Sequence, residues 1–224
     1  MTRAGGWVIL TFPPLCHQGP VLHLPWLCTM PTQERIAKIR RVVAQRQRGL
    51  VVVLEDIHDP HNAEAVLRTC DAVGVQEAYF VFEREEYYDP RRVGKQSSAS
   101  ANKWIDCHVF QSTAACIEQL KTRQYESVAT VVDGADEEIC VSDFTAQSVA
   151  LWFGNERAGL STEAIAAADR RVSIPMRGMV RSLTISVTAA IFLFEVVRQR
   201  RADAAAYRLS PDEAEQLCTD FLKR

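Results

Sequence analysis

Short apolar runs alternate with amphipathic segments along most of the chain. Runs of about four to eight residues that are rich in Val, Leu and Phe predict buried strands. Between them, apolar residues recur every three or four positions, which is the spacing of a helix with one buried face. The expected strands cover residues 50–57, 78–82, 127–132 and 149–153, and a further strand-like stretch lies at 170–176. This alternation predicts an α/β domain with a mainly parallel sheet flanked by helices.

The first expected helix is basic and covers residues 32–48, where Ile36, Ile39 and Val43 share one face. The second begins at Asp59 and Pro60, because aspartate is a favoured N-cap and proline suits a first turn. Its apolar face consists of Ala63, Val66, Leu67, Cys70 and Val73.

Two further helices are expected near residues 113–121 and over 210–224. The latter begins with Ser210, Pro211 and Glu213, in which Ser and Glu have the spacing of a capping box. The expected helix at 185–197 is apolar on nearly every side. A helix of this kind has to be covered on every side, either by the sheet and a second subunit or entirely within one domain. We expect a homodimer.

Length and composition fit one compact domain. The chain has 224 residues, of which 47% are hydrophobic and 24% charged, enough for a core that needs neither metal nor disulfides. The 7 cysteines form no CxxC pair and have no histidine nearby at zinc-ligand spacing. They predict reduced thiols in a cytoplasmic protein without a metal site.

Residues 1–29 are expected to be a disordered leader or a mis-assigned gene start, with Met30 as an alternative initiator before a domain over 30–224. The longest apolar run in this segment, residues 7–12, ends at Pro13 and Pro14. It is too short for a signal-peptide core or a membrane span. No membrane partner is therefore expected.

The charges are unevenly distributed although the net charge is only −2. Acidic residues gather at 83–89 and 133–138, and a long polar, basic loop is expected at 88–103. This distribution predicts a basic side that binds RNA phosphates, unless the arginines merely solvate two helices. The candidate RNA-binding residues are Arg35, Lys38, Arg40, Arg41 and Arg46 near the first helix, and Arg198 and Arg200 near the far end.

Two glycine-containing loops follow expected strands. The segment 154–161, GNERAGLS, has Leu160 where a phosphate-binding P-loop needs lysine, and no GxGxxG follows a strand. An NTPase and a nicotinamide or flavin dehydrogenase are therefore excluded. Gly154 and Gly159 instead allow backbone to approach a ligand where Glu156 follows a strand. The segment 174–179, IPMRGM, is a second such loop or an ordinary strand-to-helix connection.

Three segments together resemble the motifs of the SpoU-type RNA 2′-O-ribose methyltransferases of the SPOUT superfamily. They are HNAEAVLRTCDAVGV at 61–75, LWFGNERAGLS at 151–161 and the stretch from RRVSIPM through RGMVRSLTISVTAAIFLFE, ending at 195. The resemblance covers nearly all of residues 30–224. It is strongest to the TrmH group, which methylates the D-loop guanosine at tRNA position eighteen.

This resemblance implies a homodimer with a trefoil knot over residues 149–200 and S-adenosylmethionine bound in the knot. It assigns tRNA as the partner and Asn62, Arg68, Glu156 and Ser182 as the catalytic residues. By motif alignment, the cofactor-binding residues are Thr130, Val131, Gly154, Asn155, Ile174, Met176, Gly178, Leu183 and Thr184.

Each proposed catalytic residue also has a purely structural alternative. Asn62 and Ser182 are residue types that cap helices, and Arg68 can pair with Glu64 one turn earlier. Glu156 can favour the positive end of a helix that starts near Ser161. For Arg68 itself, a guanidinium stays protonated and is a poor base. We therefore assign it to gripping the target phosphate.

The chain departs from the family pattern at Thr184, where the family has asparagine. A hydroxyl has a shorter reach than an amide and a different hydrogen-bonding capacity. Four hypotheses remain: a methyltransferase for the D-loop guanosine of tRNA, one for ribosomal RNA or another tRNA site, a catalytically weakened knotted RNA-binding protein, and a purely structural dimerisation module.

Overall fold

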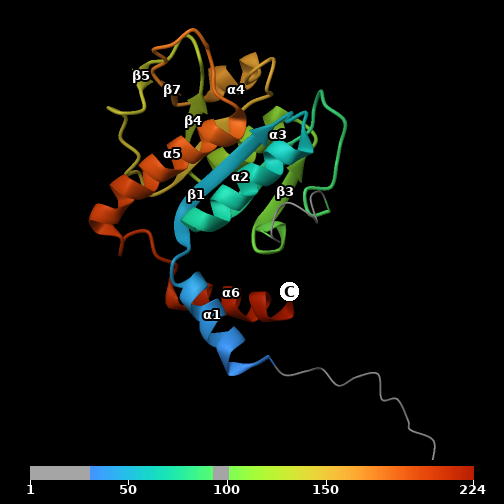
Figure 1. Cartoon of the computed structure of the whole chain (residues 1–224), viewed down its shortest axis with the longest axis vertical. Helices are drawn as coiled ribbons and strands as arrows, with labels where there is room; N and C mark the ends of the chain where they lie inside the picture. Colours follow the sequence, from blue (N-terminus) through green and yellow to red (C-terminus); the bar gives the residue numbers. More distant parts are fainter. Residues whose placement is uncertain (1–30, 93–100) are drawn as a thin grey trace, which may run out of the picture. The chain divides into compact units, whose positions relative to one another are not determined.

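A parallel sheet organises the chain (Figure 1). In the computed structural model, which describes residues 31–92 and 101–224, seven strands pair in the order β3-β2-β1-β6-β4-β7-β5. All of these pairings are parallel. The strands are β1 Gln47–Glu55, β2 Val75–Val81, β3 Asp106–Phe110, β4 Glu126–Thr130, β5 Glu137–Glu138, β6 Val149–Phe153 and β7 Arg170–Ser173. The expected α/β class with a mainly parallel sheet is confirmed.

β1 shows why the central strands are continuous apolar runs. Val52 and Leu54 face a core that includes Leu67 and Phe192, whereas Val51 and Val53 face a second core on the other side of the sheet. Successive side chains of a strand point to opposite faces, so a strand covered on both faces needs apolar residues at every position. The sequence did not predict β3 and β5, because β3 is a short strand of mixed polarity and β5 has only two residues.

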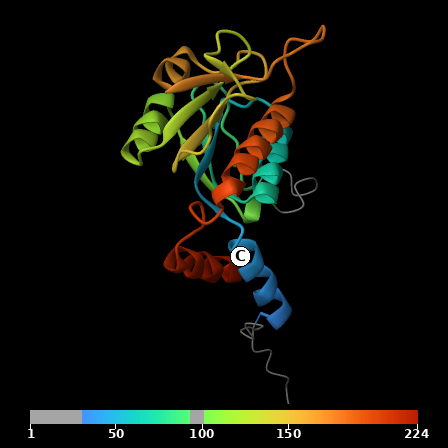
Figure 2. The same ribbon diagram turned by 90° about the vertical axis from the view of Figure 1, so that its left-hand side faces the viewer.

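Helices cover both faces of this sheet (Figure 2). α2, Pro60–Val73, and α5, Ile185–Arg200, lie together on one face. α3, Thr113–Thr122, and α4, Thr162–Ala167, lie together on the other. Within the two described stretches, no helix has the length and apolarity that a membrane crossing requires.

The beginning of α2 follows the expected local chemistry. Asp59 is the N-cap, and its Oδ1 accepts from the backbone N–H of His61 at 2.9 Å. Pro60 occupies the first turn, where its missing N–H costs nothing. Cys70 is fully buried on the inner face, as its apolar neighbours predicted.

α1, Gln33–Val43, and α6, Pro211–Lys223, pack against each other in residues 32–224, which form one unit. Their shared core contains Ile39, Val43, Leu217 and Phe221. The capping box at Ser210 is confirmed. The leader expected over residues 1–29 and part of the basic loop expected over 88–103 lie outside the described residues.

The basic helix expected over residues 32–48 is too long, because α1 ends at Val43 and β1 begins at Gln47. Arg46, in the turn between them, is only 2% exposed. Its guanidinium donates to Asp71 Oδ1 at 2.6 Å and to the backbone oxygen of Val75 at 3.2 Å. The prediction that Arg46 binds RNA is wrong, since its charge is already paired beneath the surface.

The same correction applies to Arg200, also 2% exposed. Its guanidinium lies 4.4 Å from the centre of the Tyr207 ring. Burial lowers the pKa of Arg200 to about 10. The side chain donates to four backbone oxygens, those of Phe144, Arg48, Gly49 and Ala146. Arg200 therefore joins the end of α5 to the start of β1, and its buried guanidinium is not accessible to an RNA phosphate.

Ion pairs also revise the expected separation of acidic and basic surfaces. The acidic run 133–138 lies beside the arginines near β7 rather than away from them. The three pairs are Arg170 with Glu137 at 2.6 Å, Arg171 with Asp136 at 2.5 Å and Arg181 with Asp133 at 2.8 Å. Of the candidate RNA-binding residues, those that stay exposed are Arg35, Lys38, Arg40 and Arg41 on α1 and Arg198 on α5.

Candidate functional site

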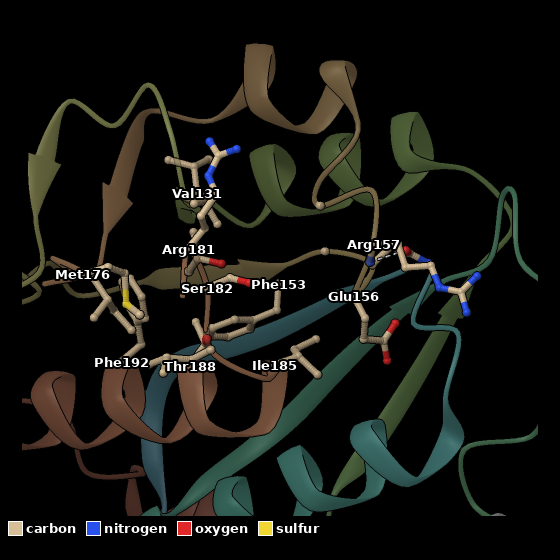
Figure 3. A pocket seen from close by; sticks show the side chains of 17 residues that line it. Val131, Phe153, Glu156, Arg157, Met176, Arg181, Ser182, Ile185, Thr188 and Phe192 are labelled. Carbon is tan, nitrogen blue, oxygen red and sulfur yellow. Dashed lines mark hydrogen bonds between the residues drawn. The ribbon is translucent and has the colours of Figure 1, made fainter. Parts of the chain in front are cut away.

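A cavity of about 190 Å³ opens at the carboxyl ends of three neighbouring strands, β6, β4 and β7. Its walls are residues 130–132 after β4, the loop that begins with Phe153 at the end of β6, and residues after β7 together with the first turns of α5. Figure 3 shows Glu156 and Arg157 at one end of the cavity and Met176 at the other. Carboxyl ends of strands are where open α/β sheets bind ligands.

Most residues that the family resemblance selected for the cofactor lie around this cavity. The predicted cofactor-binding residues that line it are Thr130, Val131, Gly154, Asn155, Ile174, Met176 and Leu183. The predicted catalytic residues Glu156 and Ser182 line it as well. Gly178 and Thr184 are not among the residues that line it. Thr184 is the N-cap of α5, and its side chain makes no capping hydrogen bond.

The loop after β6 is a tight turn that only glycine permits at its start. Asn155 and Gly159 exchange backbone hydrogen bonds of 3.1 and 2.9 Å. A Cβ on Gly154 would lie 2.2 Å from the backbone nitrogen of Leu160. Gly159 has a φ of +71°, which side chains disfavour. At Gly154 and Gly159, which both line the cavity, the loop therefore offers only backbone atoms.

Glu156 joins this loop to the start of α2. Its carboxylate accepts from the backbone N–H groups of His58 at 3.1 Å and Asp59 at 3.3 Å. It also accepts from Asn62 Nδ2 at 2.8 Å. The alternative that placed Glu156 at the helix after Ser161 is wrong, because its partners are at the positive end of α2.

The structural alternatives for Asn62 and Ser182 are corrected in a similar way. Asn62 is not the cap of α2, since Asp59 holds that position and Asn62 donates to Glu156 instead. Ser182 does not cap α5, whose N-cap is Thr184. Arg68 is exposed further along α2 and does not line the cavity. The structure thus brings Asn62, Glu156 and the cavity together and leaves Arg68 on the outer side of the same helix.

Sequence reasoning missed a set of acidic residues that support the site. Glu55, at the end of β1, is 1% exposed and accepts from Thr113 Oγ1 at 2.6 Å, from Ser161 N–H at 2.8 Å and from Ser161 Oγ at 2.7 Å. It therefore holds the beginnings of α3 and α4 together. The available signal was a carboxylate at the end of a run of apolar strand residues, at the edge where parallel strands end.

Asp56 and Glu85 form a second support. Asp56 has a φ of 52°, and its Oδ1 accepts from three successive backbone N–H groups of residues 83–85. Asn155 Nδ2 donates to the Asp56 backbone oxygen at 2.7 Å and to Glu85 Oε1 at 3.1 Å. Glu85 Oε2 in turn lies 2.8 Å from His58 Nδ1. These hydrogen bonds fix the loop after β6, which lines the cavity, to the residues that follow β1 and β2.

The cavity combines an apolar wall with polar groups, which suits a ligand with both a flat apolar part and a polar part. Phe153, Ile174, Leu183 and Phe192 form the apolar wall. The polar residues of the lining are Thr130, Asn155, Glu156, Arg157, Arg181 and Ser182. Among the described residues, those lining this cavity include no cysteine or histidine. The arrangement is therefore suited to binding and orienting a reactive cofactor.

The chain belongs to the SpoU rRNA Methylase family, whose model matches residues 49–194. A tRNA (guanosine(18)-2′-O)-methyltransferase of Thermus thermophilus is 38% identical over 199 residues, which cover 86% of this chain and 98% of the relative. The TrmH/SpoU tRNA modifying enzyme of A. aeolicus has a similar structure, with a TM-score of 0.74 at 28% identity, over 85% of this chain and 95% of that one.

A third similar structure is that of the SpoU methyltransferase AviRb from Streptomyces viridochromogenes in complex with the cofactor AdoMet. Its TM-score is 0.63 at 29% identity, and the match covers 72% of this chain and 62% of that one.

Changing Gly154→Ala is expected to destabilise the fold by about 1–3 kcal/mol, because the new Cβ would overlap the backbone of the same loop. Chemical denaturation at fixed protein concentration measures the difference. Gly178→Ala is the matched control, since a Cβ there meets nothing within 4 Å. Equal stability of the two variants would contradict the close approach at Gly154.

Proposed function

We propose that this protein transfers the methyl group of S-adenosylmethionine to the ribose 2′-hydroxyl of guanosine 18 in tRNA. The observation that carries the proposal is the cavity at the ends of β6, β4 and β7, whose lining includes most of the residues that the family resemblance assigns to the cofactor. Similarity to the Thermus enzyme over 98% of that enzyme's length extends the match to the whole catalytic domain. A tRNA substrate places the reaction in the cytoplasm.

The cavity fits S-adenosylmethionine in its chemistry. Ile174, Leu183 and Phe192 offer an apolar wall to the adenine ring, and the backbone after Gly154 offers hydrogen-bonding groups at close range. When bound, the cofactor supplies a methyl group on a positively charged sulfur. The residues of this chain have to hold that methyl group and the ribose hydroxyl in line, because transfer depends on their geometry.

Glu156 and Asn62 orient the site for the ribose. Since Asn62 Nδ2 donates to Glu156, its Oδ1 remains to accept a hydrogen bond from the substrate. Arg68 stays charged and grips the phosphate beside the target nucleotide, as a guanidinium pairs well with phosphate oxygens. Ser182 lies in the cavity wall, where its hydroxyl contributes to positioning.

We also infer the trefoil knot of the family. The support is the path of the chain after β7, which runs past the cavity at residues 174–183 and enters α5 beside α2. In doing so it lies against the loop that follows β6, with which it shares the cavity. A cofactor held between these two segments would bind within the knot.

The position of Thr184 favours an active enzyme over a weakened RNA-binding protein. Thr184 lies outside the cavity lining, and its backbone oxygen accepts from Val187 and Thr188 N–H groups at 3.0 and 2.9 Å. The start of α5 is therefore held by the backbone, whatever the side chain is. A purely structural dimerisation module would not require the cavity or the hydrogen bonds that Glu156, Asp56 and Glu85 make beside it.

Purified protein is expected to methylate an unmodified tRNA transcript at guanosine 18 when supplied with labelled S-adenosylmethionine. Digestion and nucleotide mapping identify the product. The matched control is the same transcript with 2′-deoxyguanosine at that position, which lacks the acceptor hydroxyl. Methylation of ribosomal RNA or of another tRNA ribose would contradict the assigned substrate. Binding of both ligands without transfer would support the weakened RNA-binding protein.

The exposed cations of α1 are proposed to bind tRNA. Arg35, Lys38, Arg40 and Arg41 are all exposed on this helix. Arg198, near the end of α5, is exposed but pairs with Glu195 at 2.8 Å, so contact with a phosphate would require exchange of that partner. RNA phosphates are recognised largely by such charges, which also makes binding sensitive to salt.

Changing Arg40 and Arg41 together to alanine should weaken tRNA binding and flatten its dependence on salt. Loss of two phosphate contacts would reduce the slope of log affinity against log salt by about 1.4–1.8. The control is the charge-conserving change of both residues to lysine, which should keep the slope. An unchanged slope in the alanine variant would remove α1 from the RNA-binding surface.

We propose a homodimer that uses the outer side of α5. Val187, Ile191 and Phe194 form an apolar stripe there, and their exposures are 46%, 37% and 60%. An apolar stripe on a helix of a folded domain is typical of an interface. A second copy of the chain would cover the faces of α5 that the sheet leaves open.

Changing Phe194→Glu should raise the dimer dissociation constant by about 30-fold or more, which corresponds to a loss of about 2 kcal/mol at a central interface residue. Sedimentation velocity over a concentration series measures the effect. Val141→Glu is the control, because Val141 is 74% exposed outside α5. A monomeric wild-type protein, or equal effects of both variants, would contradict the interface.

A further inference from the structure

His58 lies in the loop between β1 and α2, next to residues of the proposed catalytic site. Its backbone N–H donates to Glu156 Oε2 at 3.1 Å, the carboxylate that also binds Asn62. Its ring Nδ1 lies 2.8 Å from Glu85 Oε2. The side chain is 59% exposed, so the imidazole is accessible from solvent.

The carboxylate of Glu85 is itself held in place. Its second oxygen, Oε1, accepts from Asn155 Nδ2 at 3.1 Å, and its backbone N–H donates to Asp56 Oδ1 at 3.3 Å. Asn155 lines the cofactor cavity. The series Asn155, Glu85, His58 therefore connects the cavity loop to the imidazole.

This geometry determines which ring nitrogen can accept a proton. A carboxylate only accepts hydrogen bonds, so His58 Nδ1 carries the hydrogen shared with Glu85. In the neutral imidazole the other nitrogen, Nε2, then has a free lone pair. A carboxylate that orients a histidine in this way is the arrangement by which many enzymes position a general base.

The proposed reaction needs such a group. Forming the bond between the ribose oxygen and the methyl carbon releases the proton of the 2′-hydroxyl. Arg68 cannot accept it, because a guanidinium remains protonated in proteins. Asn62 has no basic nitrogen, and Glu156 already accepts three hydrogen bonds.

We propose that His58 is the general base that accepts the 2′-hydroxyl proton during methyl transfer. This inference rests on the proposed function. As the oxygen–methyl bond forms and the sulfur–methyl bond breaks, the hydroxyl proton passes to His58 Nε2. The positive charge thus moves from sulfur to the imidazolium, which Glu85 stabilises, and solvent later takes the proton.

The charged groups around His58 give the reaction a defined pH dependence. The pKa of His58 is raised from its usual value, chiefly by the hydrogen bond and charge of Glu85. Glu156 also raises this pKa, Arg157 lowers it, and Asp59 is the adjacent charge on the same loop. Because the base works in its neutral form, the rate should rise as pH increases through the pKa of His58.

The test is the single-turnover rate of methyl transfer as a function of pH, with enzyme in excess over RNA. His58→Asn keeps an amide N–H where Nδ1 was, so it can still bind Glu85, but it has no basic nitrogen. We expect a loss of about 100-fold or more and no rise of the rate through the pKa of the imidazole. Affinities for S-adenosylmethionine and tRNA should stay within twofold of wild type.

Two more variants sharpen the test. Glu85→Gln should move the inflection of the pH–rate profile to lower pH, because the charge that raises the pKa of His58 is gone. His108→Asn is the control, since His108 on β3 also lies near a carboxylate, Glu77 at 3.7 Å, but outside the site. Its profile should match that of wild type.

A His58→Asn variant that keeps the rate within threefold, or keeps the inflection, would overturn the proposal in favour of a positioning role. Loss of cofactor or tRNA affinity in parallel with the rate would overturn it in the same way. Failure of the proposed function looks different. Wild-type protein that methylates another ribose would contradict the assigned substrate alone, and wild-type protein that methylates no RNA would remove both proposals.

Discussion

The site depends on one carboxylate, that of Glu156, at the positive end of α2. It accepts from His58 and Asp59 N–H groups and from the Asn62 side chain. These hydrogen bonds join the loop after β6 to the loop after β1, although the two are far apart in sequence. Charged acceptors at a helix N-terminus are stabilising, and hydrogen bonds to charged groups are among the stronger ones. One side chain therefore connects the cavity with the start of α2, where the proposed catalytic residue Asn62 lies.

Buried arginines and carboxylates perform a comparable structural task around the sheet. Arg200 binds the end of α5 to backbone oxygens at the start of β1 and in the segment before β6, and Glu55 holds the beginnings of α3 and α4. Buried charges are tolerated only where their hydrogen bonds are satisfied. The partners of Arg200 are backbone oxygens near the amino ends of β1 and β6, whereas Glu55 holds Ser161, which follows the cavity-lining residues after β6.

The fold was largely predictable because its signals are local. The apolar runs of β1 and β6, the N-cap Asp59 and the capping box at Ser210 all depend on neighbouring residues. Short edge strands such as β3 and β5 carry too little apolar sequence to be recognised.

The site was predictable only in part. Family motifs selected most of the cavity lining, whereas Glu55, Asp56 and Glu85 have no signal beyond their position near the ends of strands.

By itself, the sequence determined the alternation of strands and helices, the helix starts, and the loops where glycine lets backbone approach a ligand. The tertiary structure alone decided which charges are free. Arg46 and Arg200 have the residue type of an RNA-binding surface, yet packing buries both. Residue type limits what a side chain is able to bind. The partners that it finds depend on contacts between distant segments, and these contacts form only when the chain folds.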